Sequence, residues 1–574
     1  MNRSLVKFVE FTCNILLQIQ EECAIIIRRT FDGTISIYPE ITMHNSRITY
    51  IKNILLPCLL FSGIAGVSTG LLIFLFKLCA GTVIGLSGTL YASVRENPVF
   101  LPLLIGGAAL LGLTASVILR KVPDCRGGGI PTAIAVVQGL ISFHWLKSIV
   151  FVFTSAMLTY LCGVPLGNEG PSVQMGTAVG RGIVRKHPAW ARYIMTGGAC
   201  AGFAAATGSP LTGILFAFEE AHRHISPMVF LAASIAVLAS SAVMQALCPL
   251  AGMDYALFTF GDMETLPLRY LWAALIVGLV VGFASFAFTR AYCILRNVIR
   301  HTLRHIPFTV KVVSIFTVVS LIGFLSAECI GSGHSLVDEL IEGHGIWYSL
   351  ILFLLIRAFL LLVATNTDIT GGLFVPMLAF GAILGALCGK TMIAVGILPE
   401  EHYALMVVIG IASFLSAASR TPLMALAFSI EILNGLPNLL AIGLGISIAF
   451  LVIETIGITP FTETVVESKT EAAHAGLPVQ TIHRTLEVMP GSFAVGKEIR
   501  DILWPPRFTI VSVHKNPAGS AFFSGTVLVE GDTLYVHYRT YTPGETLESL
   551  EALVGPQVQN FESAGSSGRG DALS

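Results

Sequence analysis

Charge is what this sequence has least of. Only 12% of its 574 residues are charged, whereas 54% are hydrophobic and the mean hydropathy is +0.78. Soluble domains carry about 25% charged residues, and a soluble chain of this length could not cover its surface with so few. The composition excludes a cytosolic enzyme, a disordered chain and a fibrous protein. It predicts an all-α polytopic protein embedded in the lipid bilayer. We expect that this protein is not an enzyme.

A basic bias, paired cysteines and catalytic motifs are also missing. The net charge of −1 gives no reason to expect a nucleic-acid partner. No Walker motif, HExxH or zinc spacing occurs, and Gly331-Ser-Gly-His334 is interpreted as a turn, so we expect no cofactor and no metal. The 11 cysteines form no CxxC pair. We interpret those within apolar runs as small buried residues: Cys58, Cys79, Cys162, Cys200 and Cys388.

Long apolar segments fill residues 53–464, which we predict to be the transmembrane domain. Spanning a bilayer takes about 20 apolar residues. Such segments lie near 53–80, 100–120, 146–163, 228–250, 270–292, 309–328, 348–365, 376–396, 403–418 and 437–457. Others are too short or too interrupted by Gly and Pro, namely 131–141, 172–184, 192–206, 210–221 and 422–433. Short, broken helices at membrane depth are typical of transporters with a site near the midplane.

An internal repeat runs through this domain. Residues 209–219 (SPLTGILFAFE) match residues 421–431 (TPLMALAFSIE), with Pro, Leu, Phe and Glu each 212 positions apart. Upstream, one Pro and two Gly within 171–180 are spaced like those within 376–385, at an offset of 205. Chance similarity between apolar segments is the alternative. Two matches in the same order favour homologous halves, which would cover about 53–250 and 270–460.

The two ends of the chain are expected in the cytoplasm. Residues 1–52 lack a clean apolar core with a cleavage site, so we predict no signal peptide and a cytosolic or interfacial segment, with a weak interfacial helix at 23–31. Basic residues cluster before the first span and after the second, near Lys52 and Lys121. The positive-inside rule therefore places these flanks in the cytoplasm, and we expect a bacterial inner membrane.

The composition changes again after residue 464. We predict a linker at 465–478, a small α+β domain at 479–555 and a disordered Gly/Ser-rich tail at 556–574. The alternation predicts strands within 481–489, 508–515 and 526–539. Gly531-Asp532 is expected to form a tight hairpin turn. Helices are expected at 497–504 (KEIRDILW) and from about Gly544.

Three Gly-rich stretches stand where a helix is about to start, at 126–131 (RGGGIP), 167–171 (GNEGP) and 370–376 (TGGLFVP). Pro is favourable in the first turn of a helix, and glycines let backbone N–H groups approach a ligand closely. A helix N-terminus carries about half a positive charge and unpaired donors. Several such ends that converge would bind an anion without a full positive charge. The plain alternative is that each cluster is only a turn.

Acidic residues stand at two places in the apolar sequence. Glu169 lies at a Gly-rich helix start, where an ionised carboxylate resembles the anion and would occupy its site until protonated, as gate and proton carrier in one. The alternative is an exposed glutamate that caps a helix. The adjacent Glu219 and Glu220 point about 100° apart on a helix. One would accept protons, and the other would be structural, as the repeat partner Glu431 of Glu219 indicates.

In this order the motifs GGGIP (127–131), GNEGP (167–171), SPLTGILFAFEE (209–220), GGLFVP (371–376) and ASRTPL (418–423) resemble the ClC family of chloride channels and chloride/proton antiporters. The resemblance covers about 53–470. It implies an inverted repeat of broken, tilted helices and a homodimer with one anion pathway in each subunit. It also implies that Glu169 is the gate and Glu220 the internal proton acceptor. The anion-binding residues it implies are Gly127, Gly128, Gly129, Ile130, Gly167, Asn168, Gly170, Leu373, Phe374, Phe461 and Thr462.

Three positions depart from the family pattern. Gly128 replaces the anion-coordinating serine, and Asn168 replaces the arginine of the GREGP motif. Thr462 stands at the position of the anion-coordinating tyrosine, beside Phe461. Asn168 also resembles the fluoride/proton antiporter branch, although the methionine usual in the GGGIP loop of that branch is absent. These departures leave the selectivity for chloride open.

The C-terminal domain does not resemble the paired CBS domains common in the family. Its segments FAVGKEIRDIL (493–503) and VEGDTLYVHYR (529–539) resemble the small regulatory domain at the C-terminus of TrkA-type potassium-uptake proteins. That resemblance implies a small ligand at 479–555 or dimerisation. Docking without a ligand is equally consistent with it.

Three functions remain open. The first is exchange of chloride for protons, favoured by the presence of both Glu169 and Glu220, since a coupled exchanger needs a proton path that meets the anion path. The second is a voltage-gated-type chloride channel without proton coupling, or an exchanger of fluoride or another anion. The third is a membrane receptor or scaffold, which would explain neither the Gly-rich helix starts nor the carboxylate among them.

Overall fold

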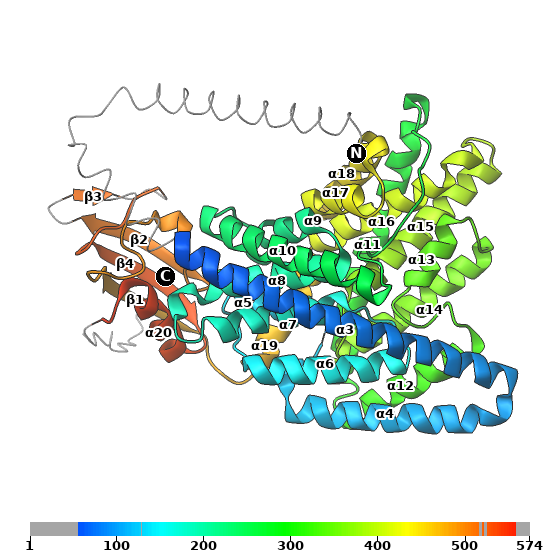
Figure 1. Cartoon of the computed structure of the whole chain (residues 1–574), viewed down its shortest axis with the longest axis horizontal. Helices are drawn as coiled ribbons and strands as arrows, with labels where there is room; N and C mark the ends of the chain where they lie inside the picture. The colour runs from blue at the N-terminus through cyan, green and yellow to red at the C-terminus, as the bar shows by residue number, and fades with distance from the viewer. Residues whose placement is uncertain (1–54, 128, 516–518, 522–524, 558–574) are drawn as a thin grey trace, which may run out of the picture. The chain divides into compact units, whose positions relative to one another are not determined.

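The structure is a computed structural model that describes residues 55–557 apart from 128, 516–518 and 522–524. The expected N-terminal segment 1–52, with its helix at 23–31, lies outside the described residues, as does most of the predicted tail. The longer helices (Figure 1) are α3 (Leu56–Glu96), α4 (Leu101–Lys121), α6 (Trp145–Leu161), α7 (Glu169–Ile183), α8 (Ala191–Thr207), α10 (Pro227–Leu247), α11 (Leu271–His301), α12 (Phe308–Leu325), α14 (Trp347–Asn366), α15 (Phe374–Ala394), α16 (Tyr403–Ser419) and α18 (Leu439–Ile456). Shorter helices are α5 (Ile130–Val137), α9 (Pro210–Phe216), α13 (His334–Ile341), α17 (Pro422–Glu431), α19 (Phe461–Ala473) and α20 (Pro543–Val554).

In the described part of the chain, nine helices are long and apolar enough to cross a membrane: α3, α4, α10, α11, α12, α14, α15, α16 and α18. The first is longer than the predicted 53–80, because α3 continues for 41 residues to Glu96. The segment near 146–163 forms the 17-residue α6, which falls short of a full span by length. The chain is therefore an integral membrane protein built from long and short helices.

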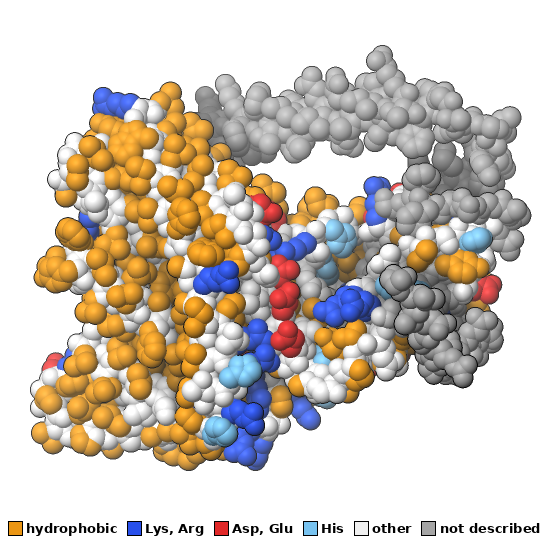
Figure 2. All heavy atoms as spheres, turned by 180° about the vertical axis from the view of Figure 1, so that it is seen from behind, with side chains coloured by type: hydrophobic (Ala, Val, Ile, Leu, Met, Phe, Trp, Pro, Cys, Tyr) orange, Lys and Arg blue, Asp and Glu red, His pale blue; other side chains and the backbone are white. Residues whose placement is uncertain are grey.

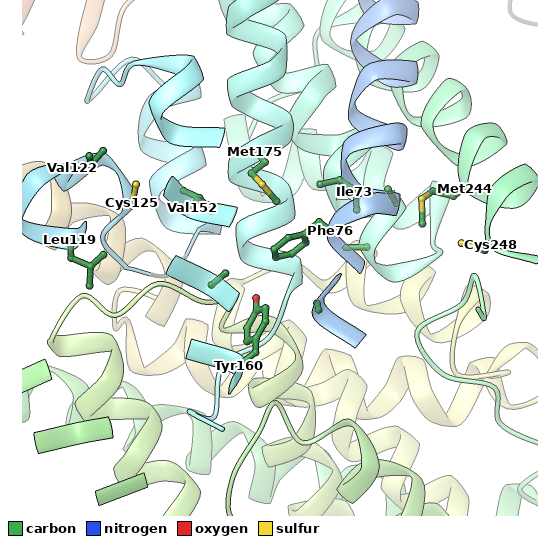
Figure 3. Close-up of a cluster of buried hydrophobic side chains, with 14 residues drawn as sticks. Ile73, Phe76, Leu119, Val122, Cys125, Val152, Tyr160, Met175, Met244 and Cys248 are labelled. Atoms are coloured by element: carbon green, nitrogen blue, oxygen red, sulfur yellow. The ribbon is translucent and has the colours of Figure 1, made fainter. Parts of the chain in front are cut away.

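The exposed and the buried residues of the membrane domain differ in kind. Large aliphatic side chains such as Leu103, Leu110 and Leu238 are more than 60% exposed on the long helices, which suits lipid rather than water. Figure 2 shows hydrophobic side chains over most of one broad face, while Lys, Arg, Asp, Glu and His gather toward one side of it. The inside is packed with small and aromatic residues. In one cluster Ile73 and Phe76 of α3 lie near Tyr160 of α6 and Met175 of α7 (Figure 3).

The repeat is visible in the helices. The pair α7 and α8 corresponds to α15 and α16: α7 and α15 begin 205 positions apart, and α8 and α16 begin and end 212 apart. Both second helices end at a residue in the left-handed conformation, Gly208 and Arg420, which are also 212 apart. The fold class is therefore the predicted repeat of broken helices in an all-α membrane domain, followed by a small strand-containing domain.

Each repeat packs its two central helices through glycine. An added Cβ on Gly198 of α8 would overlap the carbonyl oxygen of Gly176 on α7. The corresponding Gly410 of α16 stands in the same relation to Gly381 of α15. Such close backbone approach is possible only without side chains. The described cysteines are free: Cys58, Cys162 and Cys200 are buried as predicted, whereas Cys79 and Cys388 are partly exposed, contrary to the prediction.

The C-terminal domain is a four-stranded antiparallel sheet in the order β1-β4-β2-β3, with α20 beside β1. Its strands are β1 (Gln480–Glu487), β2 (Phe508–Lys515), β3 (Gly519–Ala521) and β4 (Thr533–Thr540). The alternation predicted β1, β2 and β4. In β4 every second side chain enters the core (Leu534, Val536, Tyr538), whereas a bulge in β2 brings both Ile510 and Val513 into it, and β1 contributes Leu486.

Three local predictions differ from the structure. Segment 497–504 forms only a short 3₁₀ turn, Ile499–Asp501, because its apolar side chains enter the sheet core or the contact with the membrane domain instead of lining a helix face. Residues 526–530 do not form a hairpin arm: Val527 makes a single bridge to Glu498, and β4 pairs with β1 and β2. The predicted linker 465–478 is helical to Ala473, since α19 buries Val465, Val466 and Thr470.

Candidate functional site

The Gly-rich stretches before α7 and α15 are joined by backbone hydrogen bonds. The N–H of Gly167 donates to the Gly372 carbonyl at 2.8 Å, and the N–H of Gly372 donates to the Gly167 carbonyl at 2.6 Å. The two glycines are 205 positions apart and so occupy equivalent positions in the two repeats. The hydroxyl of Tyr160, labelled in Figure 3, donates to the same Gly167 carbonyl at 2.9 Å. The starts of α7 and α15 therefore meet.

The third Gly-rich stretch lies against the same place. An added Cβ on Gly129, just before α5, would overlap the carbonyl group of Gly170 in the first turn of α7. The N–H of Gly127 donates to the carbonyl of Asp368, in the loop that leads to α15, at 2.9 Å. Gly127 and Gly129 both have positive φ, of 82° and 68°, which glycine adopts without strain. Three helix starts thus converge; Gly128 lies outside the described residues.

Glu169 is the first residue of α7 and is fully buried. Among the described residues no group meets its carboxylate oxygens in ideal hydrogen-bond geometry, and the nearest donors are the backbone N–H groups of Glu169 itself and of Val375. Its Oε2 lies against Gly167, where an added Cβ would overlap it, and the Cβ of Val375 lies 3.5 Å from that same Cβ position. A carboxylate therefore occupies the space among the converging helix starts. Isolated burial of such a group is costly unless it is protonated or meets opposite charge, so the arrangement favours a functional group over a helix cap.

The neighbours of Glu169 in the predicted site are apolar or small. Leu373 and Phe374 begin α15 and are buried, and the Phe374 ring packs edge-on against Phe203 at 5.0 Å and Phe428 at 5.4 Å. Ile130 is buried at the start of α5, and the N-cap residue of α7, Asn168, makes no side-chain cap bond. Oriented backbone dipoles therefore act on Glu169, together with the side chains of Lys77 and His334, which lie near enough to interact with it electrostatically.

The start of α19 supplies a hydroxyl group. Phe461 is fully buried against the rings of Phe288 and Tyr292, at 5.1 and 5.2 Å. Next to it, Thr462 is 4% exposed, and its Oγ1 has no hydrogen-bond partner within the described residues. A buried hydroxyl without a partner costs free energy. That donor is available to a ligand.

Lys469, farther along α19, was missed in the sequence. Its ammonium group donates to the Arg126 carbonyl at 2.7 Å and to Thr132 Oγ1 at 2.8 Å, and it lies where a Cβ on Gly127 would be. It forms no ion pair in the part of the chain that the structure describes. A cation therefore stands at the GGGIP loop. A lysine about 340 positions away in the sequence gave no signal of this contact, because no local spacing links the two segments.

Glu220 lies on a π-helical turn, Ala217–His222, that follows α9. Such turns are rare and are frequent at functional sites. The Glu220 side chain is 6% exposed and makes no ion pair among the described residues. The N–H₂ group of Gln138, at the end of α5, donates to the carbonyl of the next residue, Ala221, at 2.8 Å. Glu220 is thus a second buried carboxylate, at the opposite end of the SPLTGILFAFEE segment from its helix start.

Glu219 has a different role from its neighbour. Its two carboxylate oxygens accept the N–H groups of Leu423 and Met424 in the first turn of α17, at 3.0 and 2.6 Å. In the other repeat, Glu431 accepts the N–H groups of Leu211 and Thr212 in the first turn of α9, at 2.6 and 2.8 Å. The two glutamates cap each other's short helices, which is a structural role.

Comparisons with known proteins identify the family and the fold of the chain. A family model described as voltage gated chloride channel matches residues 111–454. A slow cyanobacterial Cl⁻/H⁺ antiporter has a similar crystal structure, with a TM-score of 0.66 and 20% identity, over 72% of this chain and 98% of that chain. A eukaryotic CLC transporter gives 0.59 and 18%, over 72% and 74%. A CLC-type fluoride/proton antiporter gives 0.56 and 22%, over 70% and 96%.

Proposed function

The chain belongs to the voltage-gated chloride channel family, a family of anion transport proteins, and from this premise we propose that it exchanges chloride for protons across a membrane. The observation that carries the proposal is the buried carboxylate of Glu169 among three converging helix starts. When ionised, it holds the place of an anion. When protonated, it loses that attraction and leaves the place to chloride, and so anion and proton alternate at one point.

Glu220 is proposed as the internal proton acceptor. It is buried on the π-helical turn, and it is not used as a helix cap, unlike Glu219. The next residues lead to Ser226, whose hydroxyl donates to the Asp501 carbonyl of the C-terminal domain at 3.4 Å. If that domain is cytosolic, as the basic loops indicate, Glu220 faces the cytoplasmic side. A proton would then pass from Glu220 to Glu169 while the anion passes the helix starts.

The anion site is proposed to comprise the backbone around Gly127–Ile130, Gly167–Gly170 and Leu373–Phe374, together with Thr462. Helix-start dipoles hold a chloride more weakly than a lysine or arginine would, which permits fast release. The hydroxyl of Thr462 would replace the tyrosine hydroxyl of relatives. We further propose a homodimer with one pathway in each subunit, in the inner membrane of a bacterium, with both termini in the cytoplasm.

The test is a measurement of proton movement in liposomes that contain the purified protein, with a chloride gradient and the voltage clamped by a potassium ionophore. An exchanger moves protons against their gradient, and Glu169→Gln abolishes this movement. Chloride flux without proton movement in the unaltered protein would instead make it a channel, which Glu169→Gln would hold open. A scaffold would show neither flux. The same vesicles with fluoride in place of chloride test the anion, since Asn168 also resembles the fluoride branch.

A further inference from the structure

The loop between α10 and α11 is held by two basic side chains that come from different helices. The ammonium group of Lys77, in the middle of α3, donates to the Tyr255 carbonyl at 3.4 Å. Nε2 of His334, the first residue of α13, donates to the Leu257 carbonyl. Both side chains also lie near enough to the Glu169 carboxylate to interact with it electrostatically. Two bases therefore approach the buried acid from two sides.

The loop itself is fixed against the end of α8. The N–H of Leu257 donates to the carbonyl of Thr207, the last residue of α8, at 2.9 Å. An added Cβ on Gly208, whose φ is 76°, would overlap the Tyr255 carbonyl oxygen. The two loop carbonyls therefore have set positions, and so do the basic groups whose hydrogen bonds they accept.

The surroundings of His334 favour its charged, imidazolium form. A carbonyl oxygen only accepts hydrogen bonds, so Nε2 carries a hydrogen toward Leu257. The other ring nitrogen, Nδ1, lies 3.1 Å from the Asp338 carboxylate, which also only accepts when it is ionised. The Phe258 ring stacks on the imidazole, with centroids 4.7 Å apart and planes 29° apart, and an aromatic face attracts a cation. Only the imidazolium donates to both acceptors, so His334 carries a positive charge here.

The two bases differ in their access to water. The side chains of His334 and Asp338 are 45% and 47% exposed, whereas Glu169 is fully buried. Lys77 is partly buried and forms no ion pair within the part of the chain that the structure describes. An opposite charge nearby favours the ionised form of a carboxylate, most strongly where water is excluded. His334 therefore links the buried carboxylate to the proton concentration of the water.

The other charged and titratable groups at this place are few. Cys248 and Asp254 lie near enough to Lys77 to interact with it electrostatically. Arg357 of α14 donates to three backbone carbonyls of the segment 328–331, which leads to α13. Its guanidinium is charged at every working pH. Among the described residues at this place, the imidazole is therefore the base that titrates near neutral pH.

We propose that Lys77 and His334 are positioning residues that hold Glu169 in its ionised form, and that His334 makes this hold depend on the pH of the adjoining water. The proposal rests on the proposed function, in which an ionised Glu169 occupies the anion site and a protonated one leaves it. When His334 loses its proton, one of the two cations is lost, and the Glu169 carboxylate then accepts a proton more readily. Lys77 acts over the whole working range of pH, so its removal has the larger effect.

The charge of Glu169 is measured directly by infrared difference spectroscopy of the full-length protein in lipid vesicles during a pH titration. The carbonyl band that disappears in Glu169→Gln reports the protonated carboxyl group. Lys77→Met should move the midpoint of this titration upward by about one pH unit, a change of about tenfold in the protonation equilibrium. His334→Gln should move it upward by about half a unit. An unchanged midpoint in both variants would overturn the proposal.

Matched variants separate the effect of charge from that of packing. Lys77→Arg and His334→Lys keep a positive charge and should leave the midpoint where it is in the unaltered protein. Lys186→Gln, which removes an exposed lysine beyond the end of α7, should also leave it unchanged. Thermal unfolding shows that each variant is folded. If the charge-keeping variants move the midpoint as far as the charge-removing ones, packing rather than charge sets it, and the proposal fails.

The link to transport is tested with the same proteins in liposomes, by chloride flux as a function of pH. Flux should rise as the pH falls, and removal of either cation should shift this profile upward by as much as it shifts the infrared midpoint. In the Glu169→Gln background neither Lys77→Met nor His334→Gln should shift the profile, because no carboxyl group remains to titrate there. A shift in that background would contradict the proposal. If the infrared midpoints move while chloride flux does not depend on pH, the proposed gate fails and the electrostatic coupling stands.

Discussion

The two repeats share a framework but not its chemistry. Their helix pairs pack through equivalent glycines, Gly198 and Gly410, and their outer glutamates cap each other's short helices. At the helix starts, however, Glu169 of the first repeat corresponds to Phe374 of the second, 205 positions on. The two repeats share the residues that hold the backbone together and differ at the position where Glu169 is proposed to meet the anion.

The same contrast appears at the other end of the short helices. Glu219 corresponds to Glu431 and shares its capping role, whereas Glu220 corresponds to Ile432, 212 positions on. Both carboxylates proposed to move protons are therefore confined to the first repeat. A cation lies at a Gly-rich loop in each half: Lys469 donates to the Arg126 carbonyl beside Gly127, and Arg357 donates to the Gly331 carbonyl at 3.0 Å and lies where a Cβ on Gly333 would be.

The largest expected effect comes from breaking the shared framework. Gly198→Ala and Gly410→Ala each place a methyl group on a backbone carbonyl of the partner helix. Overpacking of this kind costs about 3 kcal/mol. Both variants should lower the thermal unfolding midpoint of the purified protein by a similar amount. Gly81→Ala on α3, which has nothing near its Cβ position, is the control and should not lower it. Loss in only one repeat would show that the two interfaces are not equivalent.

The next largest loss of stability is expected at the two glutamates that cap each other's short helices. Glu219→Gln and Glu431→Gln each replace a carboxylate that accepts two backbone N–H groups by an amide with one acceptor. Hydrogen bonds to charged groups contribute about 1.5–3 kcal/mol, so we expect about 2 kcal/mol from each, read from the thermal midpoint. Glu96→Gln, at the exposed end of α3, is the control. Proton coupling should survive in both variants, and its loss in Glu219→Gln alone would give that residue a role beyond capping.

The comparison between the repeats can be tested at Glu220 and at its counterpart Ile432. Glu220→Gln should lower chloride-driven proton movement about tenfold, equivalent to about 1.4 kcal/mol, while chloride flux continues. The matched change in the second repeat, Ile432→Val, should leave both fluxes unaltered because Ile432 carries no proton. Vesicle assays of proton and chloride flux check both. Unaltered proton movement in Glu220→Gln would remove it from the proton path.

The smallest effect is expected at Lys469, the cation beside the GGGIP loop of the first repeat. Lys469→Gln removes a cation beside the GGGIP loop, where it attracts an approaching anion. Chloride flux should fall about two- to fivefold at low ionic strength and less at high ionic strength, because salt screens the attraction. Lys186→Gln, an exposed residue beyond the far end of α7, is the control. A loss that does not depend on salt would indicate a structural role for Lys469 instead.

Much of the fold was predictable because its signals are local. Apolar length predicted the spans, the 205 and 212 offsets predicted the repeat, and Gly-Pro starts predicted where α5, α7 and α15 begin. Binary alternation predicted β1, β2 and β4. These features depend on residues close together in the chain or on its internal similarity.

The misses depend on contacts between distant segments. Segment 497–504 has helix-forming residues, but the sheet core and α8 hold it in a turn. Lys469 reaches Arg126, and no spacing within either segment indicates that contact. The sequence predicted that converging Gly-rich helix starts would bind an anion. The backbone bridge between Gly167 and Gly372 was not predictable, because it follows from the packing of both repeats. Sequence patterns identify the candidate groups, whereas the packing of distant segments determines which residues surround each of them.

The most direct test of the asymmetry compares one pair of repeat-related positions in a single assay. Chloride-driven proton movement is measured in liposomes for the unaltered protein, Glu169→Gln and Phe374→Leu. The proposed function predicts that Glu169→Gln moves no protons, whereas Phe374→Leu, which keeps an apolar group at the start of α15, still couples protons to chloride. Persistent proton movement in Glu169→Gln would contradict the account, because the gate and the proton carrier would then not be this carboxylate.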